Sequence, residues 1–212
     1  MQVFLQFFDI HSTYFKIFSY SVSYIEFTGS VAGIIAVWLA AKSKILTWPV
    51  GLINIILFFL IFWQVELYSD VFLQVYYFCI SIYGWHNWKK EKELNAPIKL
   101  LKTSSKFLLM GTIFIATVFL GFAVSNLHVM IPNVFQKPAS FPYIDSFLAI
   151  SSIIANTLMA QRFIENWILW IIVNVISVVV YFLKDIIFVS MEYFVFLILA
   201  IYGFYYWKKE YA

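Results

Sequence analysis

The sequence predicts an all-α protein that crosses a membrane several times. Of its 212 residues, 63% are hydrophobic, 22% aromatic and only 12% charged, which is about half the charged fraction of an ordinary soluble domain. The mean hydropathy of +0.88 means more apolar surface than one soluble core of this length can hide. The apolar stretches are long and apolar on every face, which favours membrane helices over the alternating strands of a β-barrel.

Charged residues divide the chain into seven candidate membrane spans. These spans are 26–42, 44–66, 70–89, 107–136, 145–162, 165–184 and 192–208. Each reaches the roughly 20 residues that cross the hydrocarbon layer, the shortest with flanking residues or a tilt.

Residues 1–24 differ from the rest because Asp9 and Lys16 interrupt their apolar pattern. We expect an N-terminal helix that lies in the membrane interface. A cleavable signal peptide is the alternative, and the absence of a basic segment before the apolar residues speaks against it.

An internal repeat organises the chain. The segment 83–91 (Tyr-Gly-Trp-His-Asn-Trp-Lys-Lys-Glu) recurs 119 residues later as Tyr-Gly-Phe-Tyr-Tyr-Trp-Lys-Lys-Glu, and the same offset pairs Trp48 with Trp167. Two parallel three-helix repeats joined by one linker helix (3+1+3) would explain this register. The alternative is that both segments only share an aromatic belt and a basic stop. The predicted divisions are 1–24 (interfacial helix), 25–91 (first repeat), 92–144 (linker with the fourth transmembrane helix) and 145–212 (second repeat).

Basic residues predict the orientation of the chain. Of the 14 Lys and Arg residues, only Lys16, Lys137 and Lys184 fall on one side of the predicted membrane. The positive-inside rule therefore places the C-terminus in the cytoplasm and the N-terminus outside. The basic residues are accounted for by topology and by contacts with bilayer lipids, so a nucleic-acid partner is not expected.

No motif of an enzyme or of a cofactor site is recognisable. The chain lacks nucleotide-binding glycine loops and zinc-protease or hydrolase motifs, and its one cysteine, Cys79, lies in an apolar span. The carboxylates stand at span edges, whereas ion-coupled pumps hold one inside the membrane. We therefore expect no cofactor, no metal and passive transport. The competing classes are an intramembrane enzyme, a structural scaffold, and the substrate-capturing subunit of an ATP-driven importer.

Uncharged polar residues within the spans point to an internal pocket. Gln74, Tyr77, Ser81 and Trp85 follow helical spacing and share one face. On another span, Trp170 and Asn174 stand four residues apart.

Asn54 is a third amide within a span. The competing interpretation of such residues is that amides tie helices together while Trp and Tyr form interfacial belts. The offset of 119 pairs Gln74 with Tyr193, so the polar groups are not duplicated. One asymmetric solute with a flat ring, held between the repeats, would suit such a lining.

Pro49 and Gly51 lie near the start of the second span. They are hinge candidates for gating, although a proline at this position more commonly starts a helix.

These residues resemble a known family over about residues 24–210. The segments 48–54 (Trp-Pro-Val-Gly-Leu-Ile-Asn), 67–74, 83–85 and 165–174, the last ending in Trp170-x-x-x-Asn174, are similar to PnuC-type nicotinamide riboside transporters. The resemblance implies a fold related to SWEET sugar transporters and a homotrimer. It also implies facilitated diffusion of nicotinamide riboside, by alternating access, through the bacterial inner membrane for NAD synthesis.

The same resemblance assigns roles to residues and partners. Trp170 and Asn174 would contact the substrate, with Gln74, Tyr77 and Asn54 as neighbours. A cytoplasmic nicotinamide riboside kinase would keep uptake running downhill. Relatives in the superfamily carry thiamine, riboflavin or deoxynucleosides, so another vitamin is the alternative cargo.

Overall fold

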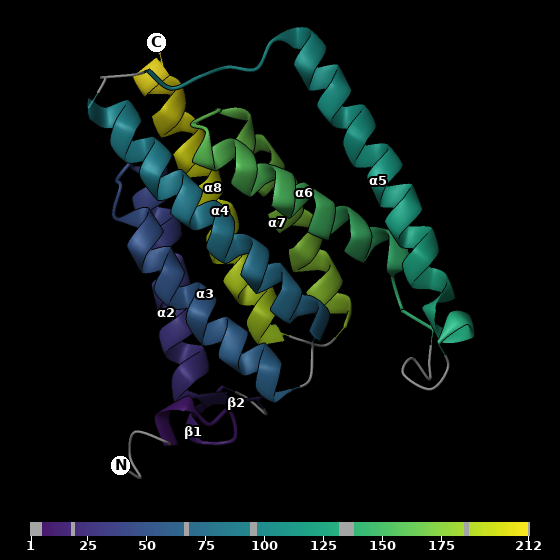
Figure 1. Cartoon of the computed structure of the whole chain (residues 1–212). Helices are drawn as coiled ribbons and strands as arrows, with labels where there is room; N and C mark the ends of the chain where they lie inside the picture. The colour runs from purple at the N-terminus through teal and green to yellow at the C-terminus, as the bar shows by residue number, and fades with distance from the viewer. Residues whose placement is uncertain are drawn as a thin grey trace.

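The computed structural model describes residues 6–17, 20–65, 68–93, 97–131, 138–184 and 187–211. These residues form a bundle of long helices with a short β-hairpin at one end (Figure 1). The elements are β1 (Thr13–Ile17), β2 (Tyr20–Ser23), α2 (Tyr24–Ala41), α3 (Thr47–Gln64), α4 (Tyr68–Glu93), α5 (Thr103–Met130), α6 (Pro142–Ala160), α7 (Glu165–Leu183) and α8 (Ile187–Tyr211).

Six of these helices are long and apolar enough to cross a membrane, namely α2, α3, α5, α6, α7 and α8. The protein is therefore an integral membrane protein. Helix α4 is not among the six. Its 26 residues span about 39 Å at 1.5 Å per residue, which exceeds the hydrocarbon thickness. Its mean hydropathy is lower because it carries Gln74, His86, Asn87 and a lysine-rich end.

The helices other than α5 pack in a closed ring. In order around the ring, α2 contacts α3, then come α4, α6, α7 and α8, and α8 contacts α2 again. Helix α5 stands at the edge and packs along α6 (Figure 1). We call the end of the bundle where α4 and α8 finish the C-terminal end, and the opposite end the hairpin end.

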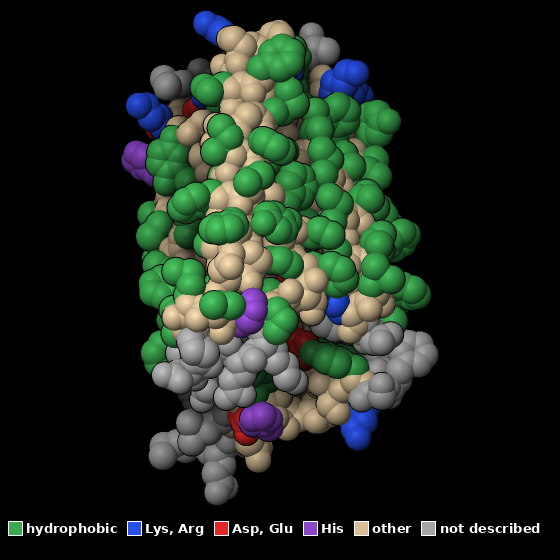
Figure 2. All heavy atoms as spheres, turned by 90° about the vertical axis from the view of Figure 1, so that its right-hand side faces the viewer, with side chains coloured by type: hydrophobic (Ala, Val, Ile, Leu, Met, Phe, Trp, Pro, Cys, Tyr) green, Lys and Arg blue, Asp and Glu red, His purple; other side chains and the backbone are tan. Residues whose placement is uncertain are grey.

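The outer face of α5 is apolar along its length. Figure 2 shows hydrophobic side chains over this face, with charged residues near the two ends of the molecule. The most exposed are Phe107, Leu108, Phe114, Ile115, Phe119 and Phe122. Such a surface is stable only against lipid or another protein.

The expected N-terminal interfacial helix is wrong for the described residues 13–17 and 20–23. Thr13–Ile17 and Tyr20–Ser23 pair as antiparallel strands. Aromatic and β-branched residues are frequent in both strands, and such residues fit a pleated ribbon better than a helix. Residues 1–5 lie outside the described part of the chain.

The hairpin joins directly to α2 through a capping box. The Ser23 hydroxyl accepts a bond from the Glu26 amide, and the Glu26 carboxylate accepts one from the Ser23 amide. The Tyr20 hydroxyl donates to the same carboxylate over 2.5 Å. Burial, and then this bond, raise the pKa of Tyr20 above its usual value, so the phenol remains a donor. The hairpin is thereby fixed over the start of α2.

The turns after α2 and α6 have the same backbone form. Ser43 has φ 52° and Arg162 has φ 62°, and they are the two non-glycine residues with positive φ in the described part of the chain. Each follows the C-cap residue of its helix, where a left-handed residue commonly ends a helix. The two positions are 119 residues apart, the offset of the sequence repeat.

Candidate functional site

Helix α7 presents a polar face to the interior of the protein. Asn174 is 3% exposed and Ser177 is 1% exposed, and Trp170 lies one turn before Asn174. Within the described residues, no hydrogen bond of the Asn174 amide is seen, but its polar atoms are not among the fully enclosed ones that lack a partner. An amide within an apolar span needs hydrogen-bond partners. Asn174 is therefore a position where a bound solute or water would supply hydrogen bonds.

Helix α4 contributes the second group of predicted residues. Gln74 and Tyr77 are partly buried and Ser81 is buried, whereas Trp85 is 38% exposed. Tyr77 lies near Ser152 of α6, the neighbour of α4 in the ring. The predicted polar face therefore faces inward from Gln74 to Ser81, and Trp85 is the most exposed of its members.

An aromatic group on α7 and α8 also lies in the interior, and the sequence analysis did not single it out. The rings of Tyr181 and Tyr193 stack at 5.2 Å with an interplanar angle of 9°. Phe196 contacts Tyr193 edge-on at 6.2 Å. Tyr181 is seven residues after Asn174 and thus on its face of α7. Tyr193 is the repeat equivalent of Gln74. These two relationships are visible in the sequence and could have pointed to both tyrosines.

Asn54 is used by the fold itself. Its Nδ2 donates a 2.8 Å hydrogen bond to the Gly29 carbonyl, which ties α3 to α2. A Cβ on Gly33 would stand 2.8 Å from the same nitrogen and 3.7 Å from Phe196. The Asn54 amide nitrogen therefore ties two helices together. The Asn54 side chain also lies near Phe196 and so stays close to the interior aromatic residues.

The hinge candidates lie in the first turns of α3. Pro49 is two residues after the helix start at Thr47. In this first turn, the missing N–H of a proline breaks no hydrogen bond within the helix. A Cβ on Gly51 would meet only Ala36, at an ordinary 3.8 Å. Close packing does not require this glycine, and the hinge role stays a prediction.

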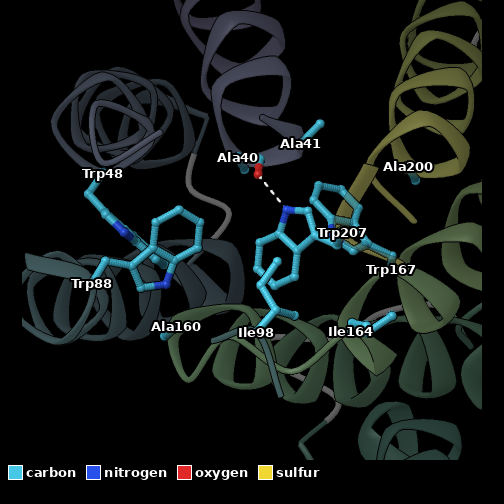
Figure 3. Packing of buried hydrophobic residues seen from close by; sticks show 10 residues of the cluster. All are labelled: Ala40, Ala41, Trp48, Trp88, Ile98, Ala160, Ile164, Trp167, Ala200 and Trp207. Atoms are coloured by element: carbon cyan, nitrogen blue, oxygen red, sulfur yellow. Dashed lines mark hydrogen bonds between the residues drawn. The ribbon is translucent and has the colours of Figure 1, made fainter. Parts of the chain in front are cut away.

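Four tryptophans, which we call the tryptophan cluster, close the ring toward the C-terminal end (Figure 3). They are Trp48, Trp88, Trp207 and Trp167, all at most 2% exposed. Consecutive ring centroids are 5.3, 5.6 and 5.7 Å apart. An interfacial belt would leave these rings exposed, so the belt interpretation is wrong for Trp48 and Trp88.

The cluster is symmetric under the offset of 119. Trp48 and Trp88 meet edge-on at 89°, and their equivalents Trp167 and Trp207 meet at 83°. Trp48 fills the space beside Gly84 as Trp167 fills the space beside Gly203. The repeat that was visible in the sequence is thus also a repeat of contacts.

Polar contacts join the same segments at the C-terminal end. The Ser43 hydroxyl donates to the Glu210 carboxylate over 2.6 Å. At the equivalent place, Arg162 stands 3.8 Å from Glu91. Glu91 also pairs with Lys99. The Ser43–Glu210 and Arg162–Glu91 contacts each connect a turn to the end of a helix from the other half of the sequence.

Ion pairs and potential metal ligands are sparse in the interior of the described chain. In that part, no three His, Cys, Asp or Glu residues gather as a metal site would require. The pair Lys184–Asp145, at 3.2 Å, lies at the hairpin end. Lys106 pairs with Glu165 over 2.8 Å at the start of α7. The described cations therefore lie at the two ends, and aromatic side chains line much of the interior.

A closed ring of apolar helices around buried polar and aromatic side chains defines a polytopic membrane protein. Residues 23–209 match the family described as nicotinamide mononucleotide transporter. The chain belongs to this family, and its resemblance to PnuC-type transporters is confirmed. The relatives are named as transporters, not as enzymes.

Individual relatives support this assignment. The chain is 35% identical over 204 residues to the nicotinamide riboside transporter PnuC of Escherichia coli (strain K12), covering 87% of this chain and 84% of the relative. It is 22% identical to the riboflavin/roseoflavin transporter RibM of Streptomyces davaonensis over 92% of this chain and 89% of that protein. A crystal structure of the vitamin B3 transporter PnuC has the same fold, with TM-score 0.64 and 22% identity over 86% of this chain and 79% of that one.

Proposed function

We propose that the protein carries nicotinamide riboside across the bacterial cytoplasmic membrane by facilitated diffusion. The observation that carries this proposal is the buried amide of Asn174, which is 3% exposed and lies one turn from Trp170. Nicotinamide riboside has a flat cationic ring, a carboxamide and ribose hydroxyls. Trp170 would stack on the ring by cation–π attraction. Asn174 and Gln74 would bond the carboxamide or the hydroxyls, and Tyr77 would do either.

An interior without a cation among the described residues favours the riboside over its phosphorylated form. A phosphate dianion needs a cationic partner when it leaves water. The described Lys and Arg residues lie toward the ends of the bundle. The family description names the mononucleotide, whereas the relative at 35% identity is named for the riboside. The absence of an interior cation among the described residues supports the riboside as the cargo.

The proposed architecture is two parallel three-helix repeats with α5 as the linker. The first repeat is α2, α3 and α4, and the second is α6, α7 and α8. The paired contacts of the tryptophan cluster support it, because each contact recurs 119 residues later. Helix α4 would then be the seventh span. Of its polar side chains, Gln74 is partly buried and Ser81 is buried, and such groups are tolerated inside a bundle.

Alternating access would be a rocking of one repeat against the other around the site. In the present arrangement the tryptophan cluster blocks the path toward the C-terminal end. Transport requires that the contact between Trp88 and Trp207, which joins the two repeats, opens and re-forms. Pro49 and Gly51 lie where α3 meets this cluster, which is where a hinge would act.

The positive-inside rule favours a cytoplasmic C-terminal end, with the hairpin end outside. A cytoplasmic kinase that phosphorylates the riboside would keep uptake running downhill. The exposed face of α5 would contact lipid or a second copy in a homotrimer. No carboxylate is needed for ion coupling in this mechanism.

Two alternatives retain the fold. Another vitamin, such as riboflavin or thiamine, is the alternative cargo, and the likeness to RibM supports a flat aromatic substrate in general. The second alternative is a substrate-capturing subunit of an ATP-driven importer, which would co-purify with an ATPase.

The cargo is tested by binding. Purified protein is titrated with nicotinamide riboside, nicotinamide mononucleotide, thiamine and riboflavin, with Asn174→Leu as the variant. We expect the riboside to bind tightest and the variant to lose at least about tenfold in affinity. Unchanged affinity in a folded Asn174→Leu protein would remove this residue from the site. Tighter binding of thiamine or riboflavin would reassign the cargo.

A further inference from the structure

A cavity of about 330 Å³ lies at the C-terminal end of the bundle, away from the candidate solute site. Its volume is at the lower end of the range for small-molecule pockets, roughly 300–1,000 Å³. Its lining includes Ser43, Ile45, Lys92, Ile98, Arg162 and Glu210. Neither Trp170 nor Asn174 lines it, so it is a separate space.

The walls of this cavity come from both halves of the sequence. Ser43 lies in the turn after α2, and Lys92 lies in the last turn of α4. Arg162 lies in the turn after α6, and Glu210 lies near the end of α8. Main-chain hydrogen bonds from Lys99 to the 162–164 turn hold the remaining wall in place. The cavity therefore spans the seam between the proposed repeats.

Two cations face one carboxylate in the cavity. The Lys92 side chain makes no ion pair with any residue in the described part of the chain. The Arg162 guanidinium is 3.8 Å from Glu91, and Glu91 also pairs with Lys99. The Glu210 carboxylate already accepts the Ser43 hydroxyl. The lining thus has a positive excess.

We infer that this cavity binds a phosphate group carried on a small molecule with hydroxyl groups. A planar guanidinium and an ammonium together match the charge and the several acceptor oxygens of a phosphate. Glu210, as an acceptor, suits a neighbouring hydroxyl of the ligand. Ile45 and Ile98 give an apolar wall for the remainder of the molecule.

The consequence for transport rests on the proposed function. A ligand that contacts both repeats stabilises the arrangement in which the tryptophan cluster is closed. Binding at this end would therefore slow opening on the cytoplasmic side. A phosphorylated form of the transported solute would then act as an inhibitor from the cytoplasm, at a site that is distinct from the solute site.

The test uses nicotinamide mononucleotide as the probe in isothermal titration. The protein, with residues 1–212, is reconstituted in nanodiscs of zwitterionic lipid and carries Asn174→Leu so that binding at the solute site is weakened. We expect saturable binding that Lys92→Gln and Arg162→Gln each weaken at least tenfold, the loss expected when a charged hydrogen bond is removed. Lys90→Gln is the matched control, because Lys90 is exposed on the same helix and does not line the cavity.

A second arm separates a soluble phosphate from a lipid headgroup. Nanodiscs with phosphatidylglycerol are compared with those without it. Binding of the probe in zwitterionic lipid supports a soluble ligand. If phosphatidylglycerol competes with the probe, and this competition disappears in Lys92→Gln, the same phosphate site is occupied by a lipid headgroup. If neither phosphate source binds, or if Lys92→Gln binds both as the parent does, the inference is wrong. Because riboside binding by protein with Asn174 intact is measured separately, this failure is distinct from failure of the proposed function.

Discussion

The indole nitrogen of Trp207 donates a 3.0 Å hydrogen bond to the main-chain oxygen of Ala40 (Figure 3). Trp88, its repeat equivalent, donates over 3.0 Å to the oxygen of Met159, which is the equivalent of Ala40. Each tryptophan therefore caps the end of a helix in the other half of the chain. This exchange binds the two halves at the C-terminal end, where the tryptophan cluster closes the ring.

The exchange predicts a selective loss of stability on removing the indole N–H. Trp207→Phe and Trp88→Phe keep an aromatic ring but remove the indole donor, and the main-chain oxygens keep only the bonds from turn amides such as Ser43 and Arg162. We expect each to cost about 1 kcal/mol beyond the change in ring size, which is roughly 2–4 °C in the unfolding midpoint for a chain of this length. Thermal unfolding of the purified protein measures it.

Trp167→Phe is the matched control for this prediction. Trp167 is equally buried in the same cluster, but its indole nitrogen has no hydrogen-bond partner among the described residues. Removing an unpaired N–H costs less than removing a paired one. Equal destabilisation by Trp167→Phe and Trp207→Phe would show that the hydrogen bond contributes nothing.

Glycine substitutions test the close approach of helices within each half. A Cβ on Gly84 would lie 2.4 Å from the Trp48 ring, and one on Gly203 would lie 2.7 Å from the Trp167 ring. Gly84→Ala and Gly203→Ala must displace a buried indole, and overpacking of this kind costs about 1–3 kcal/mol.

Gly111→Ala is the control, because nothing lies within 4 Å of its would-be Cβ on α5. It should leave the unfolding midpoint unchanged or raise it, since alanine favours helix over glycine. Thermal unfolding compares the three variants. A midpoint for Gly84→Ala as high as that for Gly111→Ala would contradict the packing described.

The two interior asparagines should behave differently. Asn54→Leu removes the bond from α3 to the Gly29 carbonyl, so its main effect should be a lower unfolding midpoint. Asn174→Leu removes no hydrogen bond that is seen to another described residue, so the fold should tolerate it while riboside affinity falls at least tenfold. Thermal unfolding and riboside titration of both variants measure this difference. A loss of affinity in Asn54→Leu and a loss of stability in Asn174→Leu would exchange the roles of the two residues.

Much of the architecture could be predicted because long apolar runs and a fixed repeat offset are properties of the sequence itself. The hairpin could not, because the pairing of Thr13–Ile17 with Tyr20–Ser23 depends on register and turn geometry rather than on hydropathy. The burial of Trp48 and Trp88 was also missed. An aromatic residue near a helix end looks the same in sequence whether it faces lipid or a neighbouring helix.

The candidate site was predictable in part. Asn174 and Gln74 stood out because an amide within an apolar span is costly unless it has hydrogen-bond partners. Tyr181 and Tyr193 did not, since tyrosine is common in this chain and only their stacking distinguishes them. The ambiguity of Asn54 could be resolved only by seeing that its Nδ2 bonds to Gly29. Residues that tie helices together can be separated from residues that line the interior only when the neighbouring helices are known.

The most direct test of the central claim is uptake of labelled nicotinamide riboside into proteoliposomes of the purified protein with no ion gradient and no ATP. The account predicts equilibration of the label to equal concentrations inside and outside, inhibited by unlabelled riboside and lost in Asn174→Leu. Uptake that appears only when an ion gradient or an ATPase is added would contradict facilitated diffusion.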